Sequence, residues 1–274
     1  MPELPEVETT RLGISPYIEK ACITDVTIRN FSLRWPIDPE LAHILTGKTI
    51  HTITRRAKYL LFHCESDGTL IIHLGMSGKL RILEYNTAPQ AEKHDHFEIA
   101  FDNGQLLRYN DPRRFGAILW TNQATEQHTL LNHLGPEPLS SEFDSNYLFQ
   151  QSRSRKCSIK TLIMNGKVVV GVGNIYASES LFIAKIHPKI VANTLSKKQC
   201  ASLVDAIKTI LAKAIKAGGT TLKDFRKSDG NPGYFSQQLN VYGRKDKVCT
   251  QCDGIIQHFK ELQRATFFCP NCQK

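Results

Sequence analysis

The sequence predicts an α+β protein in which a β-rich N-terminal domain with a leading helix precedes a helical domain and a cysteine-bearing tail. Strand-like patterns prevail between about residues 22 and 120, helical periodicity follows residue 144, and two Cys-x2-Cys pairs lie near the C-terminus. The expected limits are 1–132 for the first domain, 133–146 for a linker, 147–238 for the helical domain and 239–274 for the tail.

The chain is expected to begin with a short helix. Pro2 and Pro5 stand near its start, where a missing N–H costs little, and three glutamates between residues 3 and 8 suit the positive end of the helix dipole. Gly13 is expected to end this helix. A second short helix is predicted to open at residues 38–40, Asp-Pro-Glu.

Apolar runs predict the strands of the first domain. The sequence Asp-Asn-Gly at residues 102–104 is typical of a hairpin turn between two of them. A segment rich in proline, serine and acids then predicts the linker around residues 135–144. The clearest strands are TLIIHL (69–74), HFEIAF (96–101), QLLRY (105–109) and GAILW (116–120).

The second half of the chain carries helical signals. Ser196 and Gln199 have capping-box spacing, and Gly218-Gly219 is expected to end the helix that they begin. The stretch 158–186 predicts two helices separated by a glycine-containing turn. The apolar stripe of the long helix, which belongs in the core, is Leu203, Ile207, Ile210 and Ala214.

Charge is distributed unevenly along the chain. The net charge is +9, but residues 1–149 hold 14 Lys and Arg against 19 Asp and Glu, whereas residues 150–274 hold 21 against 7. The basic half favours a polyanionic partner such as nucleic acid, because neutralised phosphates release counterions. A solvated lysine-rich surface explains the charge equally well.

Composition excludes several classes of protein. With 41% apolar and 22% charged residues, the chain is neither disordered nor fibrous. No apolar run approaches the ~18 residues of a membrane span. The N-terminal segment MPELPEVETT is acidic and lacks the apolar stretch of a secretory signal, so we expect a cytoplasmic protein without membrane association.

Four cysteines near the C-terminus predict a metal site. Sixteen residues separate the pair Cys249 and Cys252 from the pair Cys269 and Cys272, a spacing typical of four-thiolate zinc sites. Disulfides are a weaker alternative in a chain without an export signal. Four protein ligands leave no position for water, so we expect one structural, non-catalytic zinc ion.

The segment between the cysteine pairs is expected to form a hairpin. Its basic and aromatic residues suit phosphate contact in a groove: Lys260, Arg264, Phe267 and Phe268. The remaining cysteines lack partner spacing and are expected to be buried or inert thiols: Cys22, Cys64, Cys157 and Cys200.

Eight segments, in order along the chain, together resemble one family. They are MPELPEVET, RRAKYL (55–60), HLGMSG (73–78), KHDH (93–96), DPRRFG (111–116), VGNIYASE (172–179), GGTTLKDF (218–225) and the closing cysteine pairs. The chain therefore resembles formamidopyrimidine-DNA glycosylase, the bacterial repair enzyme for oxidised purines, from residue 1 to about 273. The resemblance implies a β-sandwich, then a helix-two-turns-helix domain and a zinc finger.

The start of the chain offers a nucleophile once Met1 is removed, which bacterial processing favours before a small residue. Pro2 then has a free secondary amine that titrates near ~8, so about a tenth is unprotonated at pH 7. Such an amine can attack C1′ of a damaged nucleotide and displace the base. The resulting iminium acidifies the C2′ proton, so strand cleavage follows by elimination. A proline after methionine is also common without a catalytic role.

The resemblance assigns roles to three further residues. Glu3 is implied to be the proton donor that opens the sugar ring. Lys58 is implied to be the β-turn lysine that contacts phosphate and assists elimination, and Arg264 to grip the phosphate at the lesion during the second elimination. From the residues alone, Glu3 is by default a helix-start carboxylate and Lys58 a solvated charge.

An extruded base leaves a gap in the duplex that must be filled. The resemblance implies that Met76, Arg113 and Phe115 fill it, with Arg113 facing the orphaned cytosine and Phe115 wedged into the stack. Without the resemblance, Met76 and Phe115 would be assigned to the core because both flank strands.

Further contacts with DNA are implied in the same way. The glycine-rich loop 218–235 is implied to cover the extruded base, although its composition equally suits an idle linker. Backbone phosphates are implied to contact His73, His94, Arg155 and Asn174.

The sequence thus predicts a glycosylase and abasic-site lyase for double-stranded DNA. It would release formamidopyrimidines and 8-oxoguanine opposite cytosine, then cut the strand by β- and δ-elimination. We expect a monomer, associated with the nucleoid, without a diffusible cofactor. The alternatives are endonuclease VIII, which prefers oxidised pyrimidines, a non-catalytic zinc-ribbon DNA binder and an RNA-binding ribosomal accessory protein. The methionine of HLGMSG and the RRF of DPRRFG favour the purine enzyme.

Overall fold

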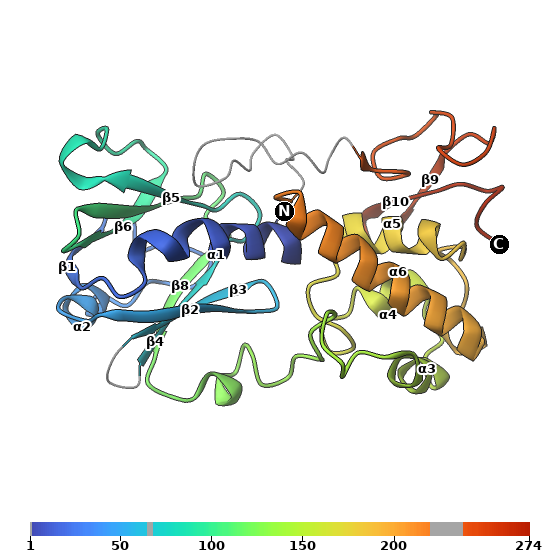
Figure 1. Cartoon of the computed structure of the whole chain (residues 1–274), viewed down its shortest axis with the longest axis horizontal. Coiled ribbons are helices and arrows are strands. Elements are labelled where there is room, and N and C mark those ends of the chain that lie inside the picture. The colour runs from blue at the N-terminus through green and yellow to red at the C-terminus, as the bar shows by residue number, and fades with distance from the viewer. Residues whose placement is uncertain (1, 65–67, 220–237) are drawn as a thin grey trace. The chain divides into compact units, whose positions relative to one another are not determined.

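The computed structural model describes residues 2–64, 68–219 and 238–274 (Figure 1). The chain forms two compact units. Residues 1–132 make up the first, with which Gly218 and Gly219 are grouped, and residues 133–217 together with the C-terminal segment make up the second. Each unit has a hydrophobic core of its own.

The first unit contains two antiparallel four-stranded sheets. All eight strands bury side chains in one common core, so the two sheets face each other as a sandwich. One sheet has the order β1 (Ile23–Ile28), β6 (Asp95–Phe101), β7 (Gln105–Asn110) and β5 (Lys79–Glu84). The other has the order β2 (Ile50–Arg56), β3 (Tyr59–Cys64), β4 (Gly68–His73) and β8 (Ala117–Thr121).

The predicted strands and turn of this unit are confirmed. β6 and β7 form an antiparallel hairpin across the Asp-Asn-Gly turn, where Gly104 has a φ of +78°. The short helix α2 (Leu41–Leu45) follows residues 38–40, and the Asp38 carboxylate accepts the Glu40 N–H at 2.9 Å. The α+β fold class follows from both sheets and the helices around them.

The first helix is longer than predicted. α1 (Leu4–Ile18) continues through Gly13 and Pro16, so the expectation that Gly13 ends it is wrong. Ile14 and Ile18 are fully buried in the core of the sandwich, where α1 packs against β2 and β5. Burial of these two side chains outweighs the weak helix propensity of glycine and the hydrogen bond that proline removes.

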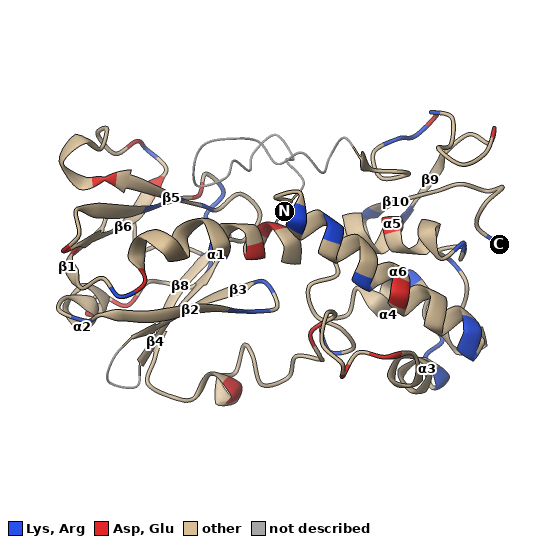
Figure 2. Ribbon diagram, in the orientation of Figure 1, with Lys and Arg blue, Asp and Glu red and all other residues tan. Residues whose placement is uncertain are grey.

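The second unit is helical and ends in a hairpin. α6 begins with the predicted capping box at Ser196 and buries the predicted apolar stripe, while its lysines lie along the helix in Figure 2. α3 begins within the segment expected to be linker, because the Asp144 carboxylate caps it by accepting the Tyr147 N–H at 2.7 Å. The elements are α3 (Ser145–Arg153), α4 (Ile159–Ile163), α5 (Asn174–Ile183), α6 (Lys197–Lys216), β9 (Gln257–Glu261) and β10 (Arg264–Phe268).

Glu179 of α5 holds the segment that leads to the hairpin. Its side chain is fully buried. Oε1 accepts the backbone N–H groups of Val241 at 2.8 Å and Tyr242 at 2.9 Å, and Oε2 accepts the backbone and side-chain N–H groups of Asn240 at 2.9 and 3.0 Å. Four donors therefore converge on one carboxylate.

Glu179→Gln is expected to destabilise the chain by about 2–4 kcal/mol, because an amide group would face donors that a carboxylate accepts. Urea unfolding measures the change. The exposed Glu142→Gln is the matched control and is expected to stay within about 0.5 kcal/mol of the wild type. Equal stabilities of the two variants would contradict the anchoring role.

Candidate functional site

The first described residues are buried. Glu3 is the N-cap residue of α1, and its backbone N–H donates to Glu6 Oε2 at 2.8 Å. Glu6 is buried as well, and nothing in its sequence context had marked it beyond the helix dipole. Gly219 passes so close that a Cβ there would lie 3.2 Å from Glu6 Oε1. Glu6 therefore contacts both the residue beside Pro2 and the start of the predicted base-covering loop, whose residues 220–235 lie outside the described residues.

Lys58 lies on a two-residue turn between β2 and β3. Arg56 pairs with Tyr59 across the hairpin, so Ala57 and Lys58 alone make the turn. Ala57 has a φ of +53°, and its carbonyl accepts an N–H from Arg55 Nη1 at 2.8 Å. The resemblance implied a lysine on a β-turn, and this lysine is held there by a tight hairpin.

His73, at the end of β4, is a neutral hydrogen-bond donor. Its ring lies 4.7 Å from the ring of Tyr59, and its Nδ1 accepts the Gly75 N–H at 3.1 Å, which leaves the proton of the neutral ring on Nε2. Burial, and next the charges of Lys58 and Arg34, lower the pKa of His73 to about 4. At neutral pH this residue therefore offers an N–H and no positive charge.

Met76, Arg113 and Phe115 line one hollow of about 680 Å³, together with His73. Met76 is 38% exposed and Phe115 is 44% exposed, so the alternative that places them in the core is wrong. The Arg113 guanidinium carbon lies 4.8 Å from the centre of the Phe115 ring, a cation–π arrangement. Residues 32–34 also line the hollow, although no sequence signal had marked them.

His94 lies in the turn before β6 and outside the lining of this hollow. Its carbonyl accepts the Asp111 N–H at 3.0 Å, and its ring meets that of His96 edge-on at 6.2 Å. The backbone bond joins the KHDH segment to the DPRRFG segment, so these two motifs are neighbours in the fold.

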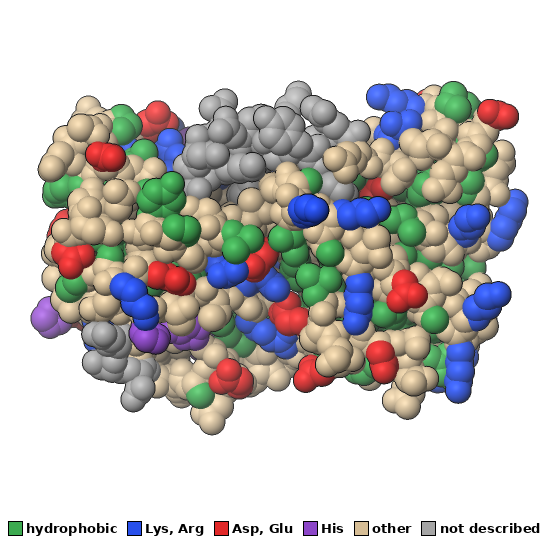
Figure 3. Space-filling model, in the orientation of Figure 1, with side chains coloured by type: hydrophobic (Ala, Val, Ile, Leu, Met, Phe, Trp, Pro, Cys, Tyr) green, Lys and Arg blue, Asp and Glu red, His purple; other side chains and the backbone are tan. Residues whose placement is uncertain are grey.

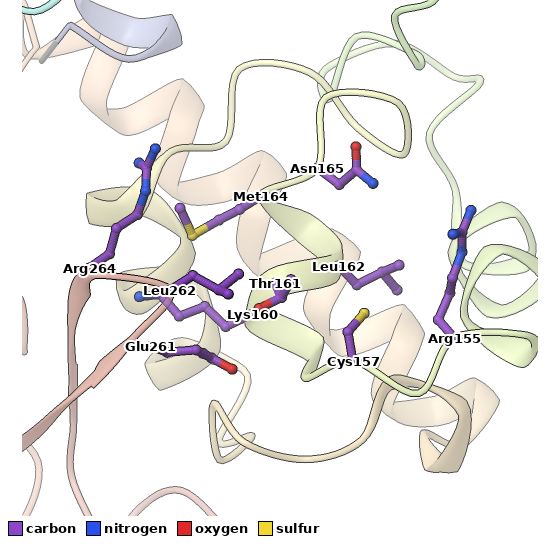
Figure 4. Close-up of a pocket in the computed structure, with 10 residues that line it drawn as sticks. All are labelled: Arg155, Cys157, Lys160, Thr161, Leu162, Met164, Asn165, Glu261, Leu262 and Arg264. Carbon is purple, nitrogen blue, oxygen red and sulfur yellow. The ribbon is translucent and has the colours of Figure 1, made fainter.

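In the second unit, Arg155 and Arg264 line one pocket of about 310 Å³ (Figure 4). Both side chains are exposed. Arg264 starts β10, and Figure 4 shows the tip of the hairpin with Glu261 and Leu262 on one side of the pocket and α4 on the other. Two cations that the sequence places over one hundred residues apart thus line the same pocket, from opposite ends in Figure 4.

Asn174 makes mainly internal hydrogen bonds. Its Oδ1 accepts from Lys160 Nζ at 2.6 Å, and its Nδ2 donates to the Ala265 carbonyl at 2.9 Å. Lys160 is almost fully buried, also donates to Thr266 Oγ1 at 2.6 Å, and lines the same pocket as Arg264. Sequence reasoning missed Lys160, because a lysine within a helical stretch has no distinguishing pattern.

Phe267 and Phe268, the two aromatic residues of β10, pack against rings outside the hairpin. Phe267 meets Tyr242 at 5.1 Å and Phe268 meets His187 at 4.7 Å between ring centroids. Phe268 is buried, so the expectation that both rings contact phosphate is wrong. Phe267 packs against the small core that the hairpin module shares with Phe182 of α5, because a two-stranded ribbon has little apolar surface of its own to bury.

The other four cysteines differ from one another. Cys64 and Cys200 are buried, as expected, and burial raises the pKa of both thiols, to about 11 for Cys64. Cys22 and Cys157 are half-buried, and Cys157 lines the pocket of Arg155.

Cys249, Cys252, Cys269 and Cys272 have the geometry of a tetrahedral metal site. Their sulfur atoms lie within 4.8 Å of one another, and three of the Sγ–Sγ distances are 3.9, 3.6 and 3.5 Å. A tetrahedron with ~2.3 Å from centre to sulfur has edges of ~3.8 Å, whereas a disulfide needs ~2.05 Å. The four thiolates therefore suit one structural zinc ion, as the spacing predicted.

Three family models match the chain. The N-terminal domain of formamidopyrimidine-DNA glycosylase matches residues 1–118, the H2TH domain of the same enzyme matches residues 134–226, and a zinc finger found in FPG and IleRS matches residues 246–274. The chain belongs to the formamidopyrimidine-DNA glycosylase family. The sandwich, the helical unit and the cysteine cluster follow the same order as these three models.

Individual members of the formamidopyrimidine-DNA glycosylase family resemble this chain in sequence and structure over nearly their full length. The formamidopyrimidine-DNA glycosylase of Saccharophagus degradans is 56% identical over 100% of both chains. The crystal structure of the MutM (FPG) protein of Thermus thermophilus has a TM-score of 0.89 at 34% identity, covering 99% of this chain and 98% of that one. A complex of the Lactococcus lactis Fpg with DNA containing N7-benzyl-Fapy-dG has a TM-score of 0.91 at 37% identity, covering 100% of both.

The surface charge and the length of the apolar helices add little to this family assignment. On the face drawn in Figure 3, the Lys and Arg side chains of the second unit alternate with acidic and apolar ones. Within the described residues, every helix is too short or too polar to cross a membrane. The face drawn in Figure 3 is therefore not uniformly basic.

Loss of zinc is expected to unfold the hairpin module, because its own core holds few apolar side chains and structural zinc contributes on the order of 10 kcal/mol. Cys272→Ser should lower the zinc content below one ion per chain and expose residues 245–274 to proteolysis. Cys22→Ser, which removes a thiol outside the cluster, is the control and should retain one zinc. Full protease resistance of the zinc-free chain would contradict the structural role.

Proposed function

We propose that this chain is a base-excision repair enzyme that removes oxidised purines from double-stranded DNA and then cleaves the strand. The observation that carries the proposal is the exposed pair Met76 and Phe115 beside Arg113, at the rim of one hollow. Exposed apolar side chains at a turn suit insertion into a base stack. Relatives support it, since the Lactococcus lactis enzyme is solved with DNA that contains Fapy-dG or an abasic site.

The chemistry would start at Pro2. After loss of Met1, the Pro2 nitrogen attacks C1′, the glycosidic bond breaks, and the base leaves with the bonding electrons and the proton that the Pro2 N–H gives up. Glu3 donates a proton to O4′ as the sugar ring opens, which leaves an iminium between Pro2 and C1′. Removal of the C2′ proton expels the 3′ phosphate, and a second elimination expels the 5′ phosphate.

Cations and neutral donors would hold the phosphates. Lys58 and His73 lie close together in the first unit, and Arg155 and Arg264 share a pocket in the second. Arg113 would face the cytosine left without its partner, which would favour 8-oxoguanine opposite cytosine. We propose a monomer that acts at the nucleoid, where its substrate is.

Borohydride trapping tests the proposal. A duplex with one 8-oxoguanine opposite cytosine is expected to yield a covalent adduct that maps to the N-terminal peptide at Pro2. A chain with a retained N-terminal extension, in which the Pro2 nitrogen is an amide, should give none. An adduct only with an oxidised pyrimidine would indicate endonuclease VIII specificity, and salt-sensitive binding without any adduct would leave a DNA-binding protein.

Lys58 and His73 are expected to affect the salt dependence of DNA binding differently, because only Lys58 carries a charge. Lys58→Gln should reduce the slope of log affinity against log salt by about 1, because one phosphate–cation contact is lost. His73→Gln should weaken binding several-fold at pH 7.5 and leave the slope unchanged, since a pKa of about 4 keeps the ring neutral. Titrations on a duplex with a tetrahydrofuran abasic analogue measure both. A reduced slope for His73→Gln would show that the ring carries charge.

A further inference from the structure

Asp111 has a fully buried side chain that collects four donors. Its Oδ1 accepts from Ser77 Oγ at 2.5 Å and from the Arg113 N–H at 3.3 Å. Its Oδ2 accepts from Tyr109 Oη at 3.1 Å and from the Gly116 N–H at 2.9 Å. Because all four partners donate, only an acceptor with two oxygens satisfies this position.

The backbone of Asp111 adds three more bonds. Its carbonyl accepts from His96 Nε2 at 2.9 Å and from the Arg114 N–H at 3.1 Å, and its N–H donates to the His94 carbonyl at 3.0 Å. One residue thus joins three segments: the loop after β4, the turn before β8 and the start of β6. These segments carry Met76, the Arg113–Phe115 turn and His94.

Glycines let the same segments approach closely. Gly75 has a φ of +61°, and a Cβ there would lie 2.4 Å from the Phe115 carbonyl carbon. A Cβ on Gly116 would lie 1.8 Å from Tyr109 Oη, and one on Gly78 would lie 2.8 Å from it. The loop that carries Met76 and the turn that carries Phe115 therefore pack backbone against backbone.

The hydroxyl of Tyr109 stays a donor over the whole physiological range. Burial, and next the adjacent Asp111 carboxylate, raise its pKa. If the Asp111 side chain only closed its own turn, hydrogen bonds from the Arg113 and Gly116 N–H groups would be enough. Ser77 comes from a different loop and Tyr109 from the core, so Asp111 does more than close a turn.

We propose that Asp111 is a positioning residue for base extrusion: through Ser77, Tyr109 and the turn 111–116, it holds Met76 and Phe115 in one rigid wedge. This inference rests on the proposed function. A wedge that is ordered before it meets DNA loses no further freedom when it enters the stack, so insertion is favoured. The exposed tips would contact DNA, whereas Asp111 itself would never touch it.

The spectroscopic test uses a duplex with 2-aminopurine beside a tetrahydrofuran abasic analogue. Binding of the wild type is expected to raise the fluorescence as Phe115 disrupts stacking. Asp111→Asn keeps the shape of the side chain but turns an NH₂ group toward donors, so it should abolish the rise while affinity falls only several-fold. Excision of 8-oxoguanine should fall by about 100-fold, mainly in kcat.

A double-mutant cycle separates positioning from general destabilisation. If Asp111 acts through Phe115, Asp111→Asn combined with Phe115→Ala should lose no more than about twofold beyond Phe115→Ala alone. Glu98→Gln is the matched control, because Glu98 is a buried carboxylate of β6 whose ion pairs, among the described residues, are with Arg29 and Arg108 and not with the wedge segments. It should leave the fluorescence rise intact.

Tyr109→Phe and Ser77→Ala keep the inference testable if Asp111→Asn fails to fold. Each removes one donor to Asp111, and each should reduce the fluorescence rise in part.

Multiplicative losses of activity in the double-mutant cycle, or a full fluorescence rise in both donor variants, would overturn the inference. If the wild type excises while Asp111→Asn resembles Glu98→Gln, the proposed function stands and the inference falls. If the wild type neither excises nor traps but shows a rise that depends on Asp111, the proposed function falls and the positioning role stands.

Discussion

Buried carboxylates need donors, and backbone N–H groups in irregular segments need acceptors. This chain meets both requirements at once. Asp111 in the first unit and Glu179 in the second are each fully buried, and each accepts four hydrogen bonds through its side chain. Residues 75–78, 111–116 and 240–242 lie outside the sheet ladders. Asp111 bonds the segments that carry Met76 and Phe115, and Glu179 bonds the segment that leads to the β9–β10 hairpin, so these two carboxylates provide order that a ladder would otherwise give.

The result is a rigid framework with exposed tips. Met76 projects from the loop after β4 and Phe115 from the turn before β8, two segments that Asp111 joins. Lys58 is half-buried on a tight hairpin with a left-handed alanine before it. The zinc hairpin has a similar tip, where Leu262 and Gln263 both have positive φ. Strained turns next to exposed apolar or cationic side chains are features that stability alone does not favour, and they suit a surface built for a partner.

Several features were predictable because they depend on interactions between residues that are close in sequence. The hairpin at residues 102–104, the capping box at Ser196 and the cysteine spacing all act within a few residues or through one metal ion. The end of α1 was not predictable, because the burial of Ile14 and Ile18 depends on strands far along the chain. Phe267 and Phe268 were assigned to the surface for the same reason, since their partners Tyr242 and His187 lie outside the hairpin.

The sequence by itself determined the fold class, the zinc cysteines and the family, because periodicity, spacing and whole motifs survive without any knowledge of contacts. It also named Pro2, Glu3 and Lys58 through that resemblance. Only the tertiary structure decided which apolar residues are exposed, that burial lowers the pKa of His73, and which buried groups hold the wedge together. Met76, His73 and Asp111 owe these properties to neighbours that are distant in sequence, and burial and hydrogen bonding exist only once those neighbours meet.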